Sequence, residues 1–138
     1  MFKRLVICIS LVGSSVLCHA REPMAQYGES YVGPKTMTVE VAPLADSTKA
    51  LIKIVGVNHA WNGKVFLAQL RRGSNQRIEY VIAGKDGEQV IMEENPTRGT
   101  MLYLSGFGDA RLDFDRGSSF RVQPEHLLTE YENQSGAK

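Results

Sequence analysis

Residues 50–71, ALIKIVGVNHAWNGKVFLAQLR, decide the fold class. Two apolar runs, 50–58 and 64–71, flank the Asn62-Gly63 pair. Such a pair is the strongest short signal for a β-hairpin, because a type I′ turn needs positive φ at both central positions. The stretch therefore predicts two antiparallel strands joined by a two-residue turn.

Pairing outward from that turn predicts that Trp61 faces Lys64 and that His59 faces Phe66, all on one face of the hairpin. Three interpretations of this tip remain open. The face could pack down and close the end of a barrel, with Lys64 lying over the indole. Trp61 could instead stay exposed as a binding hot spot. His59 could also act as an acid–base group or a metal ligand, but no orienting carboxylate lies near it in the sequence.

Further strand patterns lie on both sides of this stretch. Residues 36–41 alternate strictly, which is typical of a half-buried strand. Residues 77–83 and 88–93 predict a second hairpin, in which an Asp86-Gly87 turn sets Lys85 opposite Glu88. Shorter strand candidates follow at 100–105, 111–115 and 119–123.

The chain changes character at residues 124–131. Pro124 stands where a first helical turn accepts proline, Glu125 follows it, and Leu127, Leu128 and Tyr131 can dock on a core. The sequence therefore predicts an all-β fold, a meander of seven or eight antiparallel strands in a small barrel or sandwich, with one short C-terminal helix. A mixed α+β fold is the main alternative.

The first twenty residues have the layout of a secretory signal peptide, with a basic start, an apolar stretch and a small residue at Ala20. The apolar stretch is shorter than the ~20 residues that a transmembrane helix needs. Lipid attachment at Cys18 is the rival interpretation, and the large Leu17 before it argues against it. We predict cleavage after Ala20 and a periplasmic location.

After the signal peptide, the sequence predicts a flexible leader at 21–35, a single domain at 36–132 and a tail at 133–138. Both cysteines, Cys8 and Cys18, leave with the signal peptide, so the domain must be held by packing alone. Loss of Lys3 and Arg4 changes the formal net charge from +1 to −1. Such a balance lacks the electrostatic footprint of a nucleic-acid-binding protein, and no transmembrane segment is predicted.

Metal ligands and cofactor motifs are sparse. Only His59 and His126 remain after export, without zinc-binding spacing, and no cofactor is predicted. Asp109, Asp113 and Asp115 form a weak calcium candidate. Strand alternation explains these residues more simply, because it puts every second side chain of residues 111–115 on the solvent side.

No catalytic residue is predicted either. The chain has no G-x-S-x-G elbow, and the adjacent Glu93 and Glu94 would point to opposite faces of a strand. An enzyme would need a cleft in which His59 or His126 meets a carboxylate.

The remaining candidates are binding residues, and six of them stand out: Trp61, Lys64, His59, Phe107, Arg72 and Arg98. We therefore expect a non-catalytic periplasmic protein that recognises and inhibits an envelope protein, such as a cell-wall hydrolase or a secreted toxin. The alternative is a β-barrel carrier of a small ligand or cell-wall fragment, with a hollow interior lined by Tyr80, Met92, Met101 and Tyr103. A small periplasmic enzyme is a lesser alternative.

Overall fold

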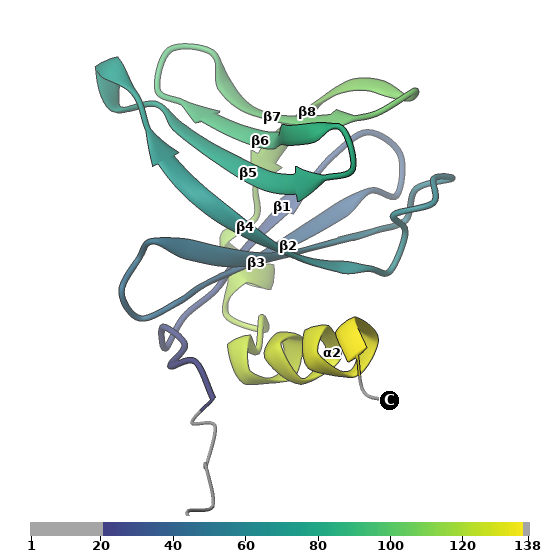
Figure 1. The fold of residues 1–138 in the computed structure, drawn as a ribbon. Helices are drawn as coiled ribbons and strands as arrows, with labels where there is room; N and C mark the ends of the chain where they lie inside the picture. The colour runs from purple at the N-terminus through teal and green to yellow at the C-terminus, as the bar shows by residue number, and fades with distance from the viewer. Residues whose placement is uncertain (1–20, 137–138) are drawn as a thin grey trace, which may run out of the picture.

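The computed structural model describes residues 21–136. Eight antiparallel strands follow one another around a closed barrel, in which β1 completes the circle by pairing with β8 (Figure 1). The strands are β1 (Glu29–Val32), β2 (Thr38–Pro43), β3 (Lys49–Val55), β4 (Val65–Arg72), β5 (Ile78–Gly84), β6 (Gly87–Asn95), β7 (Gly99–Leu104) and β8 (Gly108–Phe114). A 3₁₀ turn, η1 (Ser74–Gln76), and two helices, α1 (Arg116–Ser119) and α2 (Pro124–Gly136), complete the fold.

The predicted fold class is confirmed: the chain forms an antiparallel β-meander with one C-terminal helix, and the meander closes as a barrel. None of the helices within residues 21–136 has the length and apolarity to cross a bilayer. The predicted signal peptide, its cleavage site and Cys18 lie outside the described residues.

The inside of the barrel is packed with side chains from alternate strand positions. Val39 and Val41 point inward from β2, as the alternation predicts, and meet Ile52 and Ile54 from β3. The opposite wall contributes further buried residues, among them Tyr80, Ile82, Ile91, Met92, Leu102, Leu104, Ala110 and Leu112. Burial of this apolar surface is the main stabilising contribution in a domain without disulfides.

A second, smaller cluster lies outside the barrel, where α2 covers β2, β3 and β4 (Figure 1). Leu127 and Leu128 are buried there against Leu51 and Val65, and Tyr131 packs at the edge. The predicted helix is therefore confirmed, but it runs on to Gly136, so the expectation of a tail from residue 133 is wrong. Its last turn is held because the side chain of Gln134 bonds to the backbone of Val65.

The segment 21–35, expected to be a flexible leader, contains β1. Tyr31 is buried in the barrel, and Met24 bridges to Leu44. Arg21 reaches α2, where its Nε lies 3.0 Å from Oε1 of Glu132. The sequence hides this strand because its inward positions, Glu29 and Tyr31, are polar or amphipathic instead of aliphatic.

The connection between β3 and β4 also differs from the prediction. It is the loop 56–64 and not a two-residue turn, since Lys53 pairs with Val65 and Ile52 with Phe66. Asn62 lies at negative φ, and its Oδ1 accepts a hydrogen bond from the backbone N–H of Val57 at 3.1 Å. The predicted pairs of Trp61 with Lys64 and of His59 with Phe66 are therefore wrong as strand neighbours.

Two other local predictions need correction. In the second hairpin Gly84 pairs with Gly87, so the turn is Lys85-Asp86, and Glu88 lies opposite Ala83 and not Lys85. The predicted strand at 119–123 is absent: α1 begins after Asp115, whose side chain caps it, and a turn follows. The capping hydrogen bond of Asp115 favours a helix start at this point, whereas the apolar alternation of residues 119–123 predicted a strand.

Candidate binding surfaces

The six predicted binding residues divide between the two ends of the barrel. The first end, here the Trp61 end, is formed by loops 33–37 and 56–64 and the turns 85–86 and 105–107; it carries His59, Trp61, Lys64 and Phe107. The second end, here the Phe114 end, is formed by loops 44–48, 73–77 and 96–98 and the C-terminus of β8; it carries Arg72 and Arg98. The structure therefore brings four of the six residues together and separates the other two.

At the Trp61 end, the aromatic residues close the barrel. The indole of Trp61 packs on Phe66, with ring centroids 5.1 Å apart, and both rings lie against the interior core. The ring of His59 meets the edge of Trp61 at 5.2 Å. This arrangement supports the interpretation in which the tip packs down on the barrel.

His59 fastens the loop to a neighbouring turn. Its Nδ1 accepts a hydrogen bond from the backbone N–H of Trp61 at 3.1 Å, and its Nε2 lies 2.9 Å from the carbonyl oxygen of Ser105. Because Nδ1 is the acceptor, Nε2 carries the proton and donates a hydrogen bond to the backbone carbonyl of Ser105. Both ring nitrogens are thus engaged with backbone groups, which leaves His59 no free nitrogen for acid–base work or metal binding.

The Phe114 end carries a groove that sequence reasoning missed. Tyr27, Phe114 and Phe120 are 69%, 56% and 74% exposed, respectively. All three line one groove of about 520 Å³, together with Gly28, Glu29, Pro43, Arg116 and Ser119. We call it the aromatic groove. Its members come from the predicted leader, a predicted inward strand position and a predicted strand, so no single pattern could have joined them.

A buried polar bridge leads from this groove into the barrel. The hydroxyl of Tyr31 lies 2.7 Å from Oε2 of Glu29 and 3.1 Å from Oε1 of Glu94, and the hydroxyl of Tyr80 donates to the same Glu94 oxygen at 2.7 Å. Burial and these carboxylates raise the pKa of both tyrosine hydroxyls well above the usual range. The tyrosines therefore remain neutral donors, and the two carboxylates are held close together.

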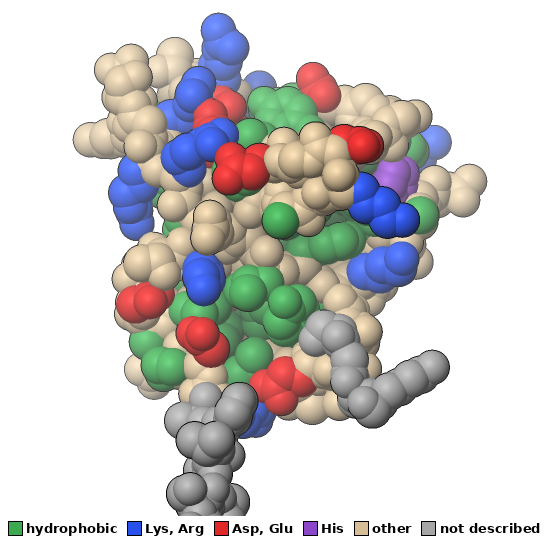
Figure 2. All heavy atoms as spheres, in the orientation of Figure 1, with side chains coloured by type: hydrophobic (Ala, Val, Ile, Leu, Met, Phe, Trp, Pro, Cys, Tyr) green, Lys and Arg blue, Asp and Glu red, His purple; other side chains and the backbone are tan. Residues whose placement is uncertain are grey.

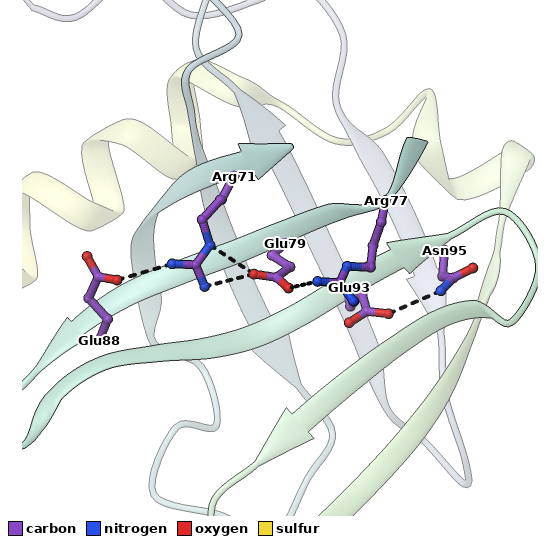
Figure 3. A network of polar contacts seen from close by, with 6 residues as sticks. All are labelled: Arg71, Arg77, Glu79, Glu88, Glu93 and Asn95. Carbon is purple, nitrogen blue, oxygen red and sulfur yellow. Dashed lines mark hydrogen bonds and ion pairs between the residues drawn. The ribbon is translucent and has the colours of Figure 1, made fainter. Parts of the chain in front are cut away.

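The arginines near the β4–β5 turn fall into two groups. Arg71 and Arg77 converge on Glu79, whose carboxylate accepts from Arg71 at 2.8 and 2.9 Å and from Arg77 at 2.6 Å (Figure 3). Arg71 also reaches Glu88 at 3.3 Å. By contrast, within residues 21–136 neither Arg72 nor Arg98 has a carboxylate within the 4.0 Å of an ion pair.

These cations give the Phe114 end a local positive surface. Lys and Arg side chains gather at the upper left of Figure 2, over the β4–β5 turn. Arg72 and Arg77 line a hollow of about 540 Å³ there, with Gly73, Gln76 and Ile78. An exposed guanidinium without an internal partner is suited to bind a carboxylate of another molecule.

The weak calcium candidate is not assembled. Asp109 and Asp113 are exposed on the outer face of β8, and Asp115 caps α1 by accepting a hydrogen bond from Ser118 at 3.1 Å. Hydrogen bonding from the hydroxyl and then the backbone N–H of Ser118 holds the pKa of Asp115 below its usual range. No group of three or more His, Cys, Asp or Glu side chains that could hold a metal ion occurs in the described part of the chain.

His126 does meet a carboxylate. Its Nε2 lies 3.3 Å from Oε1 of Glu130 one helical turn along α2, and Lys53 binds the other oxygen of Glu130 at 2.7 Å. These residues border a shallow polar hollow of about 190 Å³, together with Glu40, Arg121, Gln123 and Leu127. The imidazole is largely exposed and the carboxylate is shared, which is typical of a surface ion-pair network.

The predicted lining of a hollow barrel is only half correct. Tyr80 and Met92 point inward, but they are buried in the packed core. Met101 and Tyr103 lie on the outer face, because β7 directs Leu102 and Leu104 inward and alternate positions face opposite sides.

Comparisons with known proteins add no relative: no protein-family model matches this chain, and no curated protein or solved structure is significantly similar to it.

Proposed function

We propose that the protein is an exported, non-catalytic binding protein that recognises an envelope protein through the Phe114 end of its barrel. The observation that carries this proposal is the convergence of Tyr27, Phe114 and Phe120 on one groove while all three stay more than half exposed. Aromatic side chains dominate binding hot spots because they bring large apolar area at small entropic cost.

Charge adds a second argument. Arg72 and Arg98 lie at the same end of the barrel, and Arg116 lines the groove itself. A partner with carboxylates around an apolar protrusion would satisfy both features. Because a rigid barrel end can fill the cleft of an enzyme, inhibition of a cell-wall hydrolase or a secreted toxin is the role that we propose for this contact. The proposal that the protein is exported rests on the signal-peptide pattern of residues 1–20.

The test uses residues 21–138 as bait in a periplasmic extract, with Phe120→Ser and Tyr27→Ser as groove variants. Phe107→Ser is the matched control, because Phe107 is also half exposed but lies at the Trp61 end. We expect a partner captured by the wild type and by Phe107→Ser, and affinity lowered by about 2 kcal/mol in the groove variants. Loss of the partner with Phe107→Ser alone would move the contact to the other end of the barrel, against the proposal.

The groove also supports a second candidate function, the binding of a small ligand or cell-wall fragment. Its volume of about 520 Å³ falls in the range of small-molecule sites, and Glu29 and Arg116 add polar groups beside the rings. Calorimetric titration with a soluble peptidoglycan fragment tests this candidate. Heat of binding in the wild type that disappears with Phe120→Ser would favour it over a protein partner, and no heat in the wild type would exclude it.

A further inference from the structure

The barrel wall opens between β4 and β5. The two strands pair from Arg72 opposite Ile78 to Gln69 opposite Val81, and no further. Residues 65–68 of β4 then keep only β3 as a paired strand, and residues 82–84 of β5 keep only β6. The strands lie side by side near their turn and separate toward the Trp61 end (Figure 1). We call this opening the β4–β5 seam.

Side chains do not fill the seam. A groove of about 360 Å³ lies in it, lined by Leu67 and Gln69 on one rim and by Val81, Ile82 and Ala83 on the other, with Lys49 and Glu88 at the outside. Hydrophobic side chains gather in the middle of the molecular face in Figure 2, between the charged region above and α2 below.

Backbone groups of both rims face the seam. Leu70 donates its N–H to Thr48 on the β3 side at 2.9 Å, whereas Gly73 donates to Arg77 on the β5 side at 2.8 Å. Since backbone groups alternate along a strand, Leu67 directs its N–H and C=O toward β5, and on the other rim Ala83 faces β4. Two strand edges without a ladder partner thus confront each other, and such edges are templates for pairing with another chain.

One position of the seam is already occupied by a peptide-like group. The carboxamide of Gln134 accepts the N–H of Val65 at 3.0 Å and donates to the carbonyl of the same residue. A carboxamide carries the same donor and acceptor as a peptide bond. The side chain of Gln134 therefore pairs with the backbone N–H and C=O of Val65 in the way that an inserted strand would pair with those of Leu67.

The wide mouth of the seam is flanked by cations. Lys64 directly precedes β4 and Lys85 directly follows β5, and both are exposed. In the described part of the chain, neither lysine has a carboxylate within ion-pair distance. A strand entering here would gain from acidic side chains.

We propose that the β4–β5 seam binds an extended, acidic segment of a partner protein by strand insertion, with main-chain hydrogen bonds to Leu67 and Ala83. The backbone of the segment supplies the pairing, and its outward acidic residues meet Lys64 and Lys85. This site is separate from the aromatic groove and does not depend on it.

The test measures binding of a nine-residue peptide of alternating Glu and Val, acetylated and amidated, to residues 21–138 by fluorescence anisotropy. Amide hydrogen exchange followed by NMR locates the contact. We expect the peptide to bind and to slow exchange at the amides of Leu67 and Ala83. The same peptide with alternate backbone N-methyl groups keeps its side chains but loses its donors, so its affinity should fall at least about tenfold. A Lys and Val peptide should also bind more weakly.

Variants of the chain give a second, independent readout. Gln134→Ala frees the backbone of Val65, so the Glu and Val peptide should bind about fivefold more tightly, as one additional hydrogen bond implies. Leu67→Pro removes the N–H on the unpaired edge and should weaken binding. Phe120→Ser, in the aromatic groove, should change nothing, which keeps the two sites distinguishable. The proposal is overturned by an absence of binding, by equal binding of the N-methylated peptide, or by unchanged exchange at Leu67 and Ala83. If Leu67→Pro does not fold, Gln134→Ala and the methylated peptide still decide.

Discussion

The hydroxyl of Tyr80 donates a 2.7 Å hydrogen bond to Oε1 of Glu94 inside the barrel, and Tyr31 shares the same oxygen at 3.1 Å. A carboxylate inside a β-barrel is costly unless donors satisfy it. Tyr80 donates to Glu94, and the single hydroxyl hydrogen of Tyr31 has its shorter contact, 2.7 Å, with Glu29. Both hydroxyls can donate only while they are protonated, so the stability of the barrel should depend on pH in the alkaline range.

We predict that the protein loses stability as the pH rises above about 10, where unfolded tyrosine ionises. Burial and the neighbouring carboxylates raise the pKa of Tyr31 and Tyr80 in the fold. The unfolded state therefore releases protons that the folded state retains, and the contribution that is complete below pH 10 declines above it. Absorbance at 295 nm and circular dichroism should show these two tyrosines ionising only as the barrel unfolds. Ionisation of both in a folded barrel would contradict the assignment.

Replacing Tyr80 with Phe tests the same bridge at neutral pH. The variant keeps the ring in the core but removes one donor to Glu94. A hydrogen bond to a charged group contributes about 1.5–3 kcal/mol, so the free energy of unfolding should fall by about that amount in denaturant titrations. The matched variant Tyr103→Phe, on the outer face of β7, should leave the stability nearly unchanged.

His59 should contribute to stability and not to chemistry. His59→Ala removes the bond to Ser105 and the acceptor for Trp61, which should lower the free energy of unfolding by about 1–2 kcal/mol. Thermal unfolding of His126→Ala serves as the control, because His126 lies exposed on α2. Equal melting temperatures for the wild type and His59→Ala would show that the packing of Trp61 on Phe66 holds the loop without His59.

Trp61 is expected to act in the same way. Because its ring packs on Phe66 and the core, Trp61→Ala should lower the free energy of unfolding by about 2 kcal/mol, less than a fully buried tryptophan would cost. Partner affinity, measured below the melting temperature, should not change. Lys64→Ala is the matched control, because Lys64 is an exposed residue of the same loop, and it should leave the melting temperature nearly unchanged. An unchanged melting temperature together with lost affinity would make Trp61 a binding residue after all.

Sequence periodicity could predict the antiparallel meander, because most inward positions are aliphatic, but it left open whether the meander closes as a barrel or packs as a sandwich. Val39, Val41, Ile52 and Ile54 alternate with outward residues, and a meander follows from short connections between such strands. Periodicity did not predict β1, because its inward positions are Glu29 and Tyr31. Their burial depends on a partner, Glu94, that lies far away in the sequence.

The candidate sites were less predictable, for two physical reasons. Asn62 and Gly63 do form a turn, in which Lys64 donates its N–H to the carbonyl of Trp61 at 3.0 Å, but this turn lies inside the loop 56–64 and does not join the strands directly. The loop is held by contacts that sequence cannot show, the hydrogen bond from Val57 to Asn62 and the packing of Trp61 on Phe66. The aromatic groove depends on Tyr27, Phe114 and Phe120, which come from three segments and meet only when the barrel closes. A hydrophobic residue at an inward strand position is expected to be buried, but Phe114 lies at the end of its strand and stays exposed.

Low pH should destabilise α1, which carries Arg116 and Ser119 of the aromatic groove. Asp115 caps this helix by bonding to Ser118, and Ser119 in turn accepts the N–H of Ser30 in β1 at 2.9 Å, so the cap holds Arg116, Ser119 and Phe120 in place. The bonds from Ser118 lower the pKa of Asp115 in the fold, so its contribution is present above the ordinary aspartate pKa of about 3.9 and is lost as the pH falls through the lowered value. Melting temperatures between pH 2 and 6 should therefore fall more steeply for the wild type than for Asp115→Asn, which keeps an oxygen acceptor without the titrating charge. Parallel curves for the two proteins would mean that other carboxylates set the acid limit and that α1 is held by Ser119 and Ser30 alone.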